Sequence, residues 1–199
     1  MKTFVKLTVL SISLLLTSEV ALASASSENN NSSIQSRAIS AKLQQEMEQM
    51  IANEIQSFYV YTGMSVYFNK MGYTGMAHWA SVQSNEELTH FQKQLDFALA
   101  RNVSFSLKDV STAKTQYSSP LEAFTTAYNQ EKSLTTTFIN NSHDATSEQA
   151  YDFSSHINGF ITEQIEEENL VASIINRLEI AKSDPAALLL LDQELGARK

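Results

Sequence analysis

Residues that break helices are almost absent from this chain. Its 199 residues include only five glycines and two prolines, and the long stretches between them repeat apolar residues with a helical period. Pro120 follows a serine and Pro185 follows an aspartate, and both pairs are typical of the first residues of a helix. These features predict an all-α protein.

Four long helices and one short helix are predicted. The long ones cover residues 38–70, 73–101, 120–142 and 146–182, and the short one begins at Asp184-Pro185 and runs for about a dozen residues. Ser119 with Glu122, and Thr146 with Gln149, have the spacing of a capping box. Residues 102–118 form a long irregular link between two short-linked helix pairs. This pattern predicts a four-helix bundle with one crossover, because two unrelated hairpins would not need so long a link.

Each long helix carries one glutamate near the middle of its apolar row. Residues at i, i+3, i+4 and i+7 share a helix face, and the four glutamates in these rows are Glu54, Glu87, Glu131 and Glu167. The row through Glu87 is the least apolar, because it also contains Gln83 and Gln94. A buried carboxylate is costly unless it is protonated or paired, and four would also repel one another. A multivalent cation among them would remove both costs, whereas carboxylates at boundary positions would instead reach solvent.

The remaining donor types narrow the class of metal. Glu87 and His90 form an E-x-x-H pair on one helix face, which together with single carboxylates from other helices is typical of di-iron and di-manganese bundles. Such ligands suit Fe(II) or Mn(II) and can also hold Zn(II). On its own the pair is common by chance, and His90 alone would be interpreted as a surface or capping residue. The chain has no cysteine, which excludes thiolate catalysis, disulfides and iron–sulfur clusters.

The formal net charge of −8 argues against nucleic acid as a partner and suits the binding of cations.

At these residues the sequence resembles the bacterial-type non-haem ferritins. The resemblance covers residues 38–196 and rests on five motifs that occur in the family's order and spacing. They are NEIQSFYVY (53–61), NEELTHFQKQLDF (85–97), YNQEKSLT (128–135), TEQIEEENLVASIINRL (162–178) and DPAALLLLDQEL (184–195). The resemblance implies an all-α, ferritin-like four-helix bundle over residues 38–199, with a long crossover and a short fifth helix.

The resemblance also implies a dinuclear ferroxidase centre. Glu54, Glu87 and His90 would bind the first iron, and Glu87 would bridge to a second iron that Glu131 and Glu167 also bind.

Further roles follow from the same resemblance. Gln164 would lie beside the metal pair, and Tyr61 would donate a hydrogen bond or an electron, unless it is an ordinary core tyrosine. Glu86, Glu163 and Glu166 match the family's third iron site, which Glu167 could share. Glu168, the last glutamate of the acidic run, is predicted to face water. Leu88 stands where bacterioferritins have a haem-ligating methionine, so no haem is expected.

The implied function is iron storage and detoxification. Such a protein oxidises Fe(II) to Fe(III) with O2 and deposits ferric oxide-hydroxide inside a shell, in this family one of 24 subunits. Leu188–Leu191 is a run that a monomer would bury poorly, which favours assembly. The alternatives are a di-metal oxidase or oxygenase acting on an organic substrate, and a structural bundle without metal.

The N-terminus has the pattern of a secretory signal peptide. Lys2 and Lys6 precede the apolar run 7–16, and Ala21-Leu22-Ala23 resembles a cleavage site, so residues 1–23 are the predicted signal. The Ser/Asn-rich residues 24–37 are a predicted disordered spacer. We therefore expect export, to the periplasm in a bacterium, without stable membrane association after cleavage. If the segment is not a functional signal, the family default is the cytoplasm.

Overall fold

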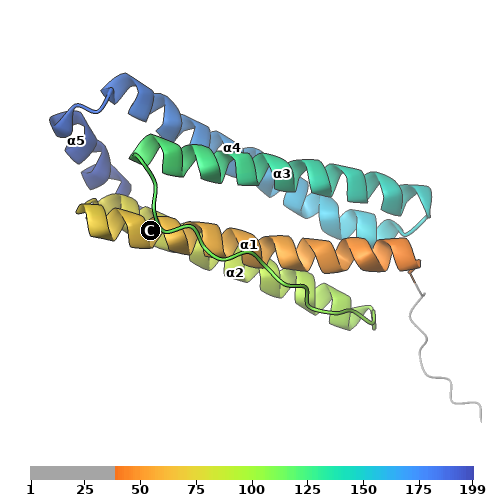
Figure 1. Ribbon diagram of the computed structural model, residues 1–199. Helices are drawn as coiled ribbons and strands as arrows, with labels where there is room; N and C mark the ends of the chain where they lie inside the picture. The colour runs from red at the N-terminus through yellow and green to blue at the C-terminus, as the bar shows by residue number, and fades with distance from the viewer. Residues whose placement is uncertain (1–38) are drawn as a thin grey trace, which may run out of the picture. The chain divides into compact units, whose positions relative to one another are not determined.

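The computed structural model describes residues 39–199, and these residues form five α-helices (Figure 1). The helices are α1 (Ala41–Met71), α2 (Thr74–Ala100), α3 (Pro120–Ser147), α4 (Tyr151–Ala181) and α5 (Pro185–Leu195). The prediction of an all-α bundle with one crossover and a short fifth helix is confirmed. The predicted signal peptide and spacer lie outside the described residues.

Among residues 39–199, no helix combines the length and the apolar character that a membrane span requires.

The long helices pack as two pairs joined by the crossover. α1 packs along α2 and α3 along α4, and residues 102–119 run beside α1 before α3 begins (Figure 1). Polar side chains of α1 hold the crossover in place, because Glu48 and Gln56 accept hydrogen bonds from the backbone amides of Ser106 and Ser111, at 3.0 and 2.6 Å. A Cβ at Gly63 would lie 2.3 Å from the carbonyl oxygen of Lys114, so glycine allows this close approach.

Capping residues explain three of the helix starts. Ser40, Ser119 and Asp184 each accept a hydrogen bond from the backbone amide three residues later. Both prolines occupy the first turn of their helices, as predicted. Glu122 accepts from Ser118 rather than from the amide of Ser119, so the capping box predicted there forms only in its serine half.

The capping box predicted at Thr146 is wrong. α3 continues to Ser147, where the Thr146 hydroxyl donates to the Ser142 carbonyl oxygen at 2.9 Å. The chain turns instead at Gln149, whose φ of 59° is left-handed, and α4 starts at Tyr151. A hydroxyl that donates to a carbonyl oxygen of the preceding turn has a hydrogen-bond partner inside the helix, so it does not end the helix.

The apolar core consists of two clusters, one in each half of the bundle. One contains Tyr61, Phe68, Trp79 and Phe124, and the other contains Met47, Phe138, Phe153 and Phe160, among others. On every long helix, the central glutamate lies in sequence between residues of one cluster and residues of the other. The fold thus places the four carboxylates in a polar layer between two apolar halves.

α5 packs tightly against the first turns of α2. An ideal Cβ at Gly75 would lie 1.7 Å from the carbonyl oxygen of Asp192, which leaves no room for a side chain. The Asp192 side chain also accepts a hydrogen bond from the amide of Met76 at 2.7 Å. Since Tyr73 at the start of α2 supplies no capping side chain, Asp192 of α5 does so.

Replacing Gly75 with alanine should therefore destabilise the protein. The added methyl group meets backbone atoms that must shift, and overpacking of this kind costs about 2–3 kcal/mol. Gly159 in α4 is the matched control, because nothing lies within 4 Å of its Cβ position. There, alanine should stabilise the helix by about 0.5–1 kcal/mol. Denaturant unfolding of both variants measures the two shifts, and equal shifts would show that the Gly75 contact is not tight.

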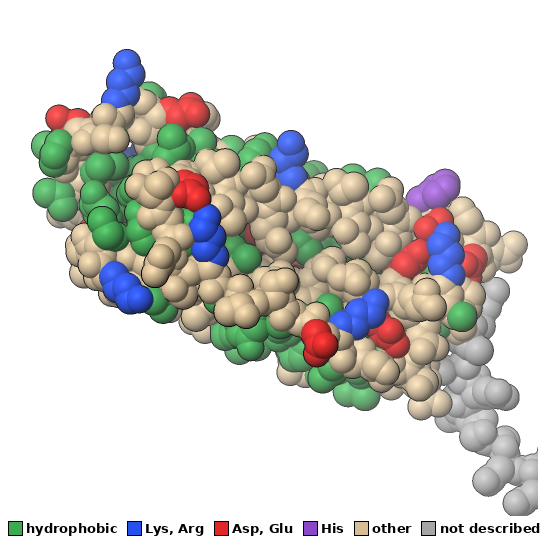
Figure 2. Space-filling model, in the orientation of Figure 1, with side chains coloured by type: hydrophobic (Ala, Val, Ile, Leu, Met, Phe, Trp, Pro, Cys, Tyr) green, Lys and Arg blue, Asp and Glu red, His purple; other side chains and the backbone are tan. Residues whose placement is uncertain are grey.

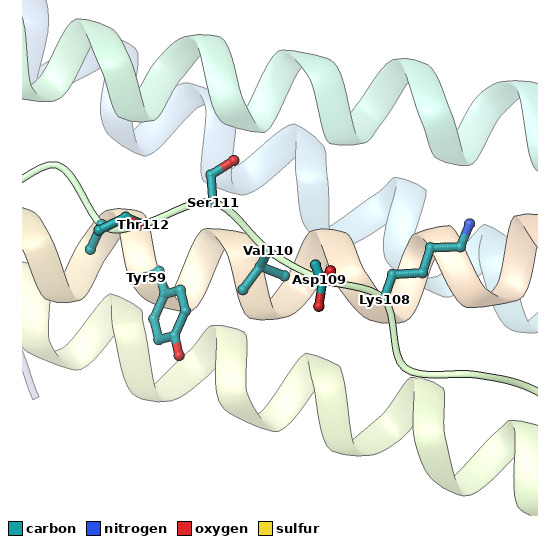
Figure 3. Close-up of a pocket in the computed structure, with 7 residues that line it drawn as sticks. Tyr59, Lys108, Asp109, Val110, Ser111 and Thr112 are labelled. Carbon is teal, nitrogen blue, oxygen red and sulfur yellow. The ribbon is translucent and has the colours of Figure 1, made fainter.

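A surface hollow of about 570 Å³ lies where the crossover meets α1. Figure 3 shows Tyr59 projecting from α1 beside Lys108–Thr112. None of the glutamates predicted to bind metal lines this hollow.

Candidate metal centre

The four core glutamates meet in the polar layer, one from each long helix. Glu54 is 1 % exposed, and Glu87 and Glu131 are fully buried, while Glu167 is partly buried. Each side chain is carried inward by a helix whose apolar residues pack above and below it. The sequence places each of these glutamates near the middle of the apolar row of its helix, and the structure brings the four into one layer.

Two groups of residues could hold metal ions, and they share a member. Glu54, Glu87 and His90 form one group, and Glu87, Glu131 and Glu167 form the other. Within each group the potential ligand atoms lie within 4.8 Å of one another. Because Glu87 belongs to both groups, two ions bound here would be neighbours bridged by one carboxylate.

Two carboxylate oxygens in this layer have no hydrogen-bond partner among the described residues. They are Oε2 of Glu87 and Oε2 of Glu167. The Nδ1 atom of His90 lies 3.6 Å from the Glu87 oxygen, which is too far for a hydrogen bond. Buried polar atoms are normally paired, and an unpaired carboxylate oxygen among other carboxylates is what a cation site requires.

Burial and mutual repulsion make these carboxyls reluctant to ionise. Burial, followed by the charge of a neighbouring glutamate, holds the pKa of Glu54 and of Glu87 well above the usual range. The same two causes raise the pKa of Glu167 to about 10. Burial raises the pKa of Glu131 as well, although hydrogen bonds from Tyr61 and Gln164 oppose the shift. A metal ion binds the deprotonated forms, so binding would release protons.

Glu131 is held by two donors that the sequence had assigned to the site. The Tyr61 hydroxyl donates to its Oε1 atom, and Gln164 Nε2 donates to its Oε2 atom at 3.0 Å. Burial keeps the pKa of Tyr61 well above 10, so the hydroxyl retains its proton. The donors fix the carboxylate in one orientation.

Two further glutamines, which were not predicted to be site residues, hold Glu87 and Glu54. Gln83 Nε2 donates to Glu87 Oε1 at 3.2 Å, and Gln94 Nε2 donates to Glu54 Oε1 at 3.4 Å. Both are buried and lie on the row of α2 that is the least apolar of the four. Polar residues within an otherwise apolar row are the sequence feature that could have identified these two glutamines as site residues.

His156 fixes the orientation of Gln94 and was also missed. Its Nε2 atom lies 2.9 Å from Gln94 Oε1, and its ring stacks on Phe97 at a centroid distance of 4.0 Å. Burial, followed by the charge of Lys93, lowers the pKa of His156 to about 4, so the ring is neutral at neutral pH. Since Gln94 donates to Glu54, its oxygen accepts, and the proton of His156 must be on Nε2.

We expect His156→Phe to weaken Fe(II) binding at the Glu54 group by about tenfold, a common loss when a residue that orients a ligand is removed. Phenylalanine keeps the stacking on Phe97 but lets the Gln94 amide rotate. His156→Gln restores a donor and should recover much of the affinity. Anaerobic Fe(II) titration by calorimetry measures both, and equal affinities for the two variants would contradict the role of the hydrogen bond.

The residues predicted for a third iron do not join either metal group. Glu86 forms an ion pair with Arg198, whereas Glu163 lies 3.1 Å from both His90 Nε2 and Lys93 Nζ. Glu166 is exposed. A third site therefore stays a prediction.

The prediction that Glu168 faces water is wrong in part. The side chain is partly buried and accepts a hydrogen bond from Thr135 of α3. The neighbouring helix covers this side of α4, which the angle on a single helix does not reveal.

Comparison with known proteins finds one family model along most of the bundle. The model for the ferritin-like domain matches residues 44–181. A bacterial non-heme ferritin of Staphylococcus aureus (strain USA300) is 33% identical over 160 residues, which cover 80% of this chain and 96% of that protein. A bacterial non-heme ferritin of Bacteroides fragilis (strain 638R) is 33% identical over 94 residues, so the match spans 47% of this chain and 59% of that relative's length.

Solved structures give the same result. An open pore ferritin from the hyperthermophilic archaeon Archaeoglobus fulgidus superimposes with a TM-score of 0.80 and 32% identity, covering 82% of this chain and all of that one. A humanized archaeal ferritin superimposes with a TM-score of 0.79 and 33% identity.

Proposed function

The chain belongs to the ferritin family, and from this premise we propose that it stores and detoxifies iron by oxidising Fe(II) with O2 at the two metal groups. The observation that carries the proposal is the pair of unpartnered oxygens of Glu87 and Glu167 in the polar layer. Iron is the substrate of this site rather than a permanent cofactor. An anionic set of hard oxygen ligands favours Fe(III) over Fe(II), which drives oxidation.

The chain's own residues would act by position and charge. Two Fe(II) ions supply two electrons, which with two protons reduce one O2 to the level of hydrogen peroxide. Glu87 brings the two ions together because both groups contain it. Tyr61 and Gln164 hold Glu131, and Gln83 and Gln94 hold the carboxylates on the other side. Ligands that are fixed before binding lose little conformational entropy when iron binds.

The proposal includes assembly into a shell, for which the family precedent is 24 subunits. Ile180, Leu189 and Leu190 are 80 %, 59 % and 67 % exposed at the end of the bundle that carries α5. Figure 2 shows hydrophobic side chains gathered at that end. Exposed apolar side chains gathered at one end are costly in a monomer and would be covered by a second copy of the chain.

The test combines activity with size. Fe(II) added in air to the purified protein should give a fast rise in ferric absorbance, and size-exclusion chromatography with iron analysis should find iron in a large assembly. Glu54→Ala and Glu131→Ala should lose the fast phase, and Glu179→Ala, at an exposed position of α4, should keep it. A monomer that oxidises iron no faster than buffer would overturn the proposal.

A further inference from the structure

The segment that follows α5 is held against α2 beside the metal groups. The close contact at Gly75 and the cap that Asp192 provides fix α5 on this helix. Beyond α5, the carbonyl oxygen of Arg198 accepts a hydrogen bond from His78 Nε2 at 2.9 Å. These contacts fix the backbone of the segment independently of the side-chain contacts of Arg198.

The Arg198 guanidinium lies over an aromatic ring of the core. The central carbon of the guanidinium is 4.8 Å from the centroid of Trp79. Stacking of this kind combines cation–π attraction with packing of the planar group, and it leaves the edge of the guanidinium free for hydrogen bonds. Only 18 % of the side chain is exposed.

The edge of the guanidinium bridges two side chains of α2. One nitrogen donates to Gln83 Oε1 at 2.8 Å, and the other pairs with the carboxylate of Glu86. Gln83 in turn donates to Glu87, the carboxylate that both metal groups share. The side-chain amide of Gln83 thus connects Arg198 to Glu87 of the metal groups. Arg198 also forms an ion pair with Glu86, the residue that precedes Glu87 in the sequence.

We infer that Arg198 is a tethered cation that competes with metal ions for Glu86. The guanidinium holds Oε2 of Glu86, so an ion that binds this oxygen must displace it, and the positive charge of Arg198 opposes any ion that approaches the carboxylate. Arg198 thus restricts loading beside the two metal groups. The inference rests on the proposed function, because it concerns the same layer of carboxylates. Lys93 lies against Glu163 in a comparable way, and thus two of the acidic residues near His90 already have a cation from the chain itself.

The size of the effect follows from the type of contact. A partly exposed ion pair together with cation–π stacking opposes a competing ion by about three- to tenfold in affinity. Removing the guanidinium should strengthen the weakest metal-binding step by this factor. If Glu86 is already absent, removing Arg198 should have no such effect.

The experiment uses Zn(II), which has no redox chemistry, in calorimetric titrations of the full chain. Arg198→Met, Glu86→Gln and the double variant are compared with the parent. Arg177→Met is the control, because Arg177 forms a similar pair with Glu194 of α5 away from the metal groups. The fluorescence of Trp79, the only tryptophan in the chain, is recorded in the same titrations.

The expected result is a three- to tenfold tighter weak step in Arg198→Met, with the double variant equal to Glu86→Gln. In the parent, the weak step should change the Trp79 emission as the guanidinium leaves, and Arg177→Met should behave like the parent. Equal weak-step affinities for Arg198→Met and the parent would overturn the inference and leave the proposed function standing. If no variant, nor the parent, binds Zn(II), both are wrong.

Discussion

Glu87→Gln should abolish the fast phase of iron oxidation and lower the initial rate by more than about a hundredfold. Losing a residue that merely orients a ligand costs about 10–100-fold in affinity or activity, and a ligand shared by both groups should cost more. Glutamine keeps the shape and the bond from Gln83 but provides no bridging carboxylate. Stopped-flow absorbance after mixing with Fe(II) in air gives the rate.

The same substitution should make the metal-free protein more stable. Glu87 is fully buried, and burial together with the charge of Glu131 holds its pKa well above the usual range. At neutral pH the folded metal-free protein must therefore keep a proton on a carboxyl that is ionised in the unfolded chain. Glutamine is neutral, has a similar volume and removes this cost, so the substitution should stabilise the protein by about 1–3 kcal/mol. Lower activity with higher stability is the signature of a functional residue, since a structural one would lose both.

Glu179→Gln is the control for both measurements, because Glu179 is exposed on the same helix as Glu167. It should leave the oxidation rate and the unfolding midpoint near those of the parent. A Glu87→Gln variant that keeps the fast phase would remove Glu87 from the centre, whatever its effect on stability.

Much of this centre can be predicted from the sequence, because helix geometry determines which residues share the inner face of a helix. Glu54, Glu87, Glu131 and Glu167 stand out through a fixed period, and the period places them on the inner faces of their helices. Pro120 is similarly informative, because proline fits the first turn of a helix and disrupts a later one.

Residues that act through tertiary contacts could not be found this way. His156 contacts Gln94 across two helices, and its own row gives no sign of that partner. Arg198 reaches Glu86 only because α5 lies across the start of α2, an arrangement that depends on the space at Gly75. Such contacts depend on how helices cross, which no period along one helix encodes.

A local hydrogen-bonding alternative accounts for the error at Thr146. Thr146 has the spacing of a cap, yet its hydroxyl bonds back to Ser142 and α3 continues past it. The competition between capping and back-bonding is decided by the next turn of the chain, where Gln149 takes a left-handed conformation.

The stability of the metal-free protein should fall as pH rises from 7 to 9.5. In this range an unfolded glutamate has lost its proton, whereas Glu167, with a pKa raised to about 10, keeps its proton in the folded state. The folded protein then holds more protons than the unfolded one, so unfolding becomes more favourable with each pH step. The slope is about 1.4 kcal/mol per pH unit for each glutamate that retains its proton.

This pH window separates the core glutamates from other groups. Below neutral pH, His156, whose pKa is lowered to about 4, makes the stability rise with pH. In the same range Glu46, whose pKa burial raises to about 7, makes the stability fall with pH. Glu122, with a pKa lowered to about 2 by Lys114 and Ser118, contributes stability that is lost only in acid. Above about pH 8, these three groups have nearly the same charge in the folded and unfolded chains, so the slope from pH 8 to 9.5 belongs to the core glutamates.

Metal binding should reverse this dependence, because an ion replaces the protons and binds the ionised carboxylates. Thermal unfolding with a chelator should therefore give a midpoint that falls from pH 7 to 9.5, and the rise in midpoint caused by Zn(II) should grow over the same range. Glu167→Gln should make the chelator curve less steep, since it removes one of the titrating glutamates but keeps its volume. A chelator curve that rises with pH would mean that the carboxylates are ionised without metal. The layer would then need another counter-charge, and the unpartnered oxygens of Glu87 and Glu167 would no longer indicate a cation site.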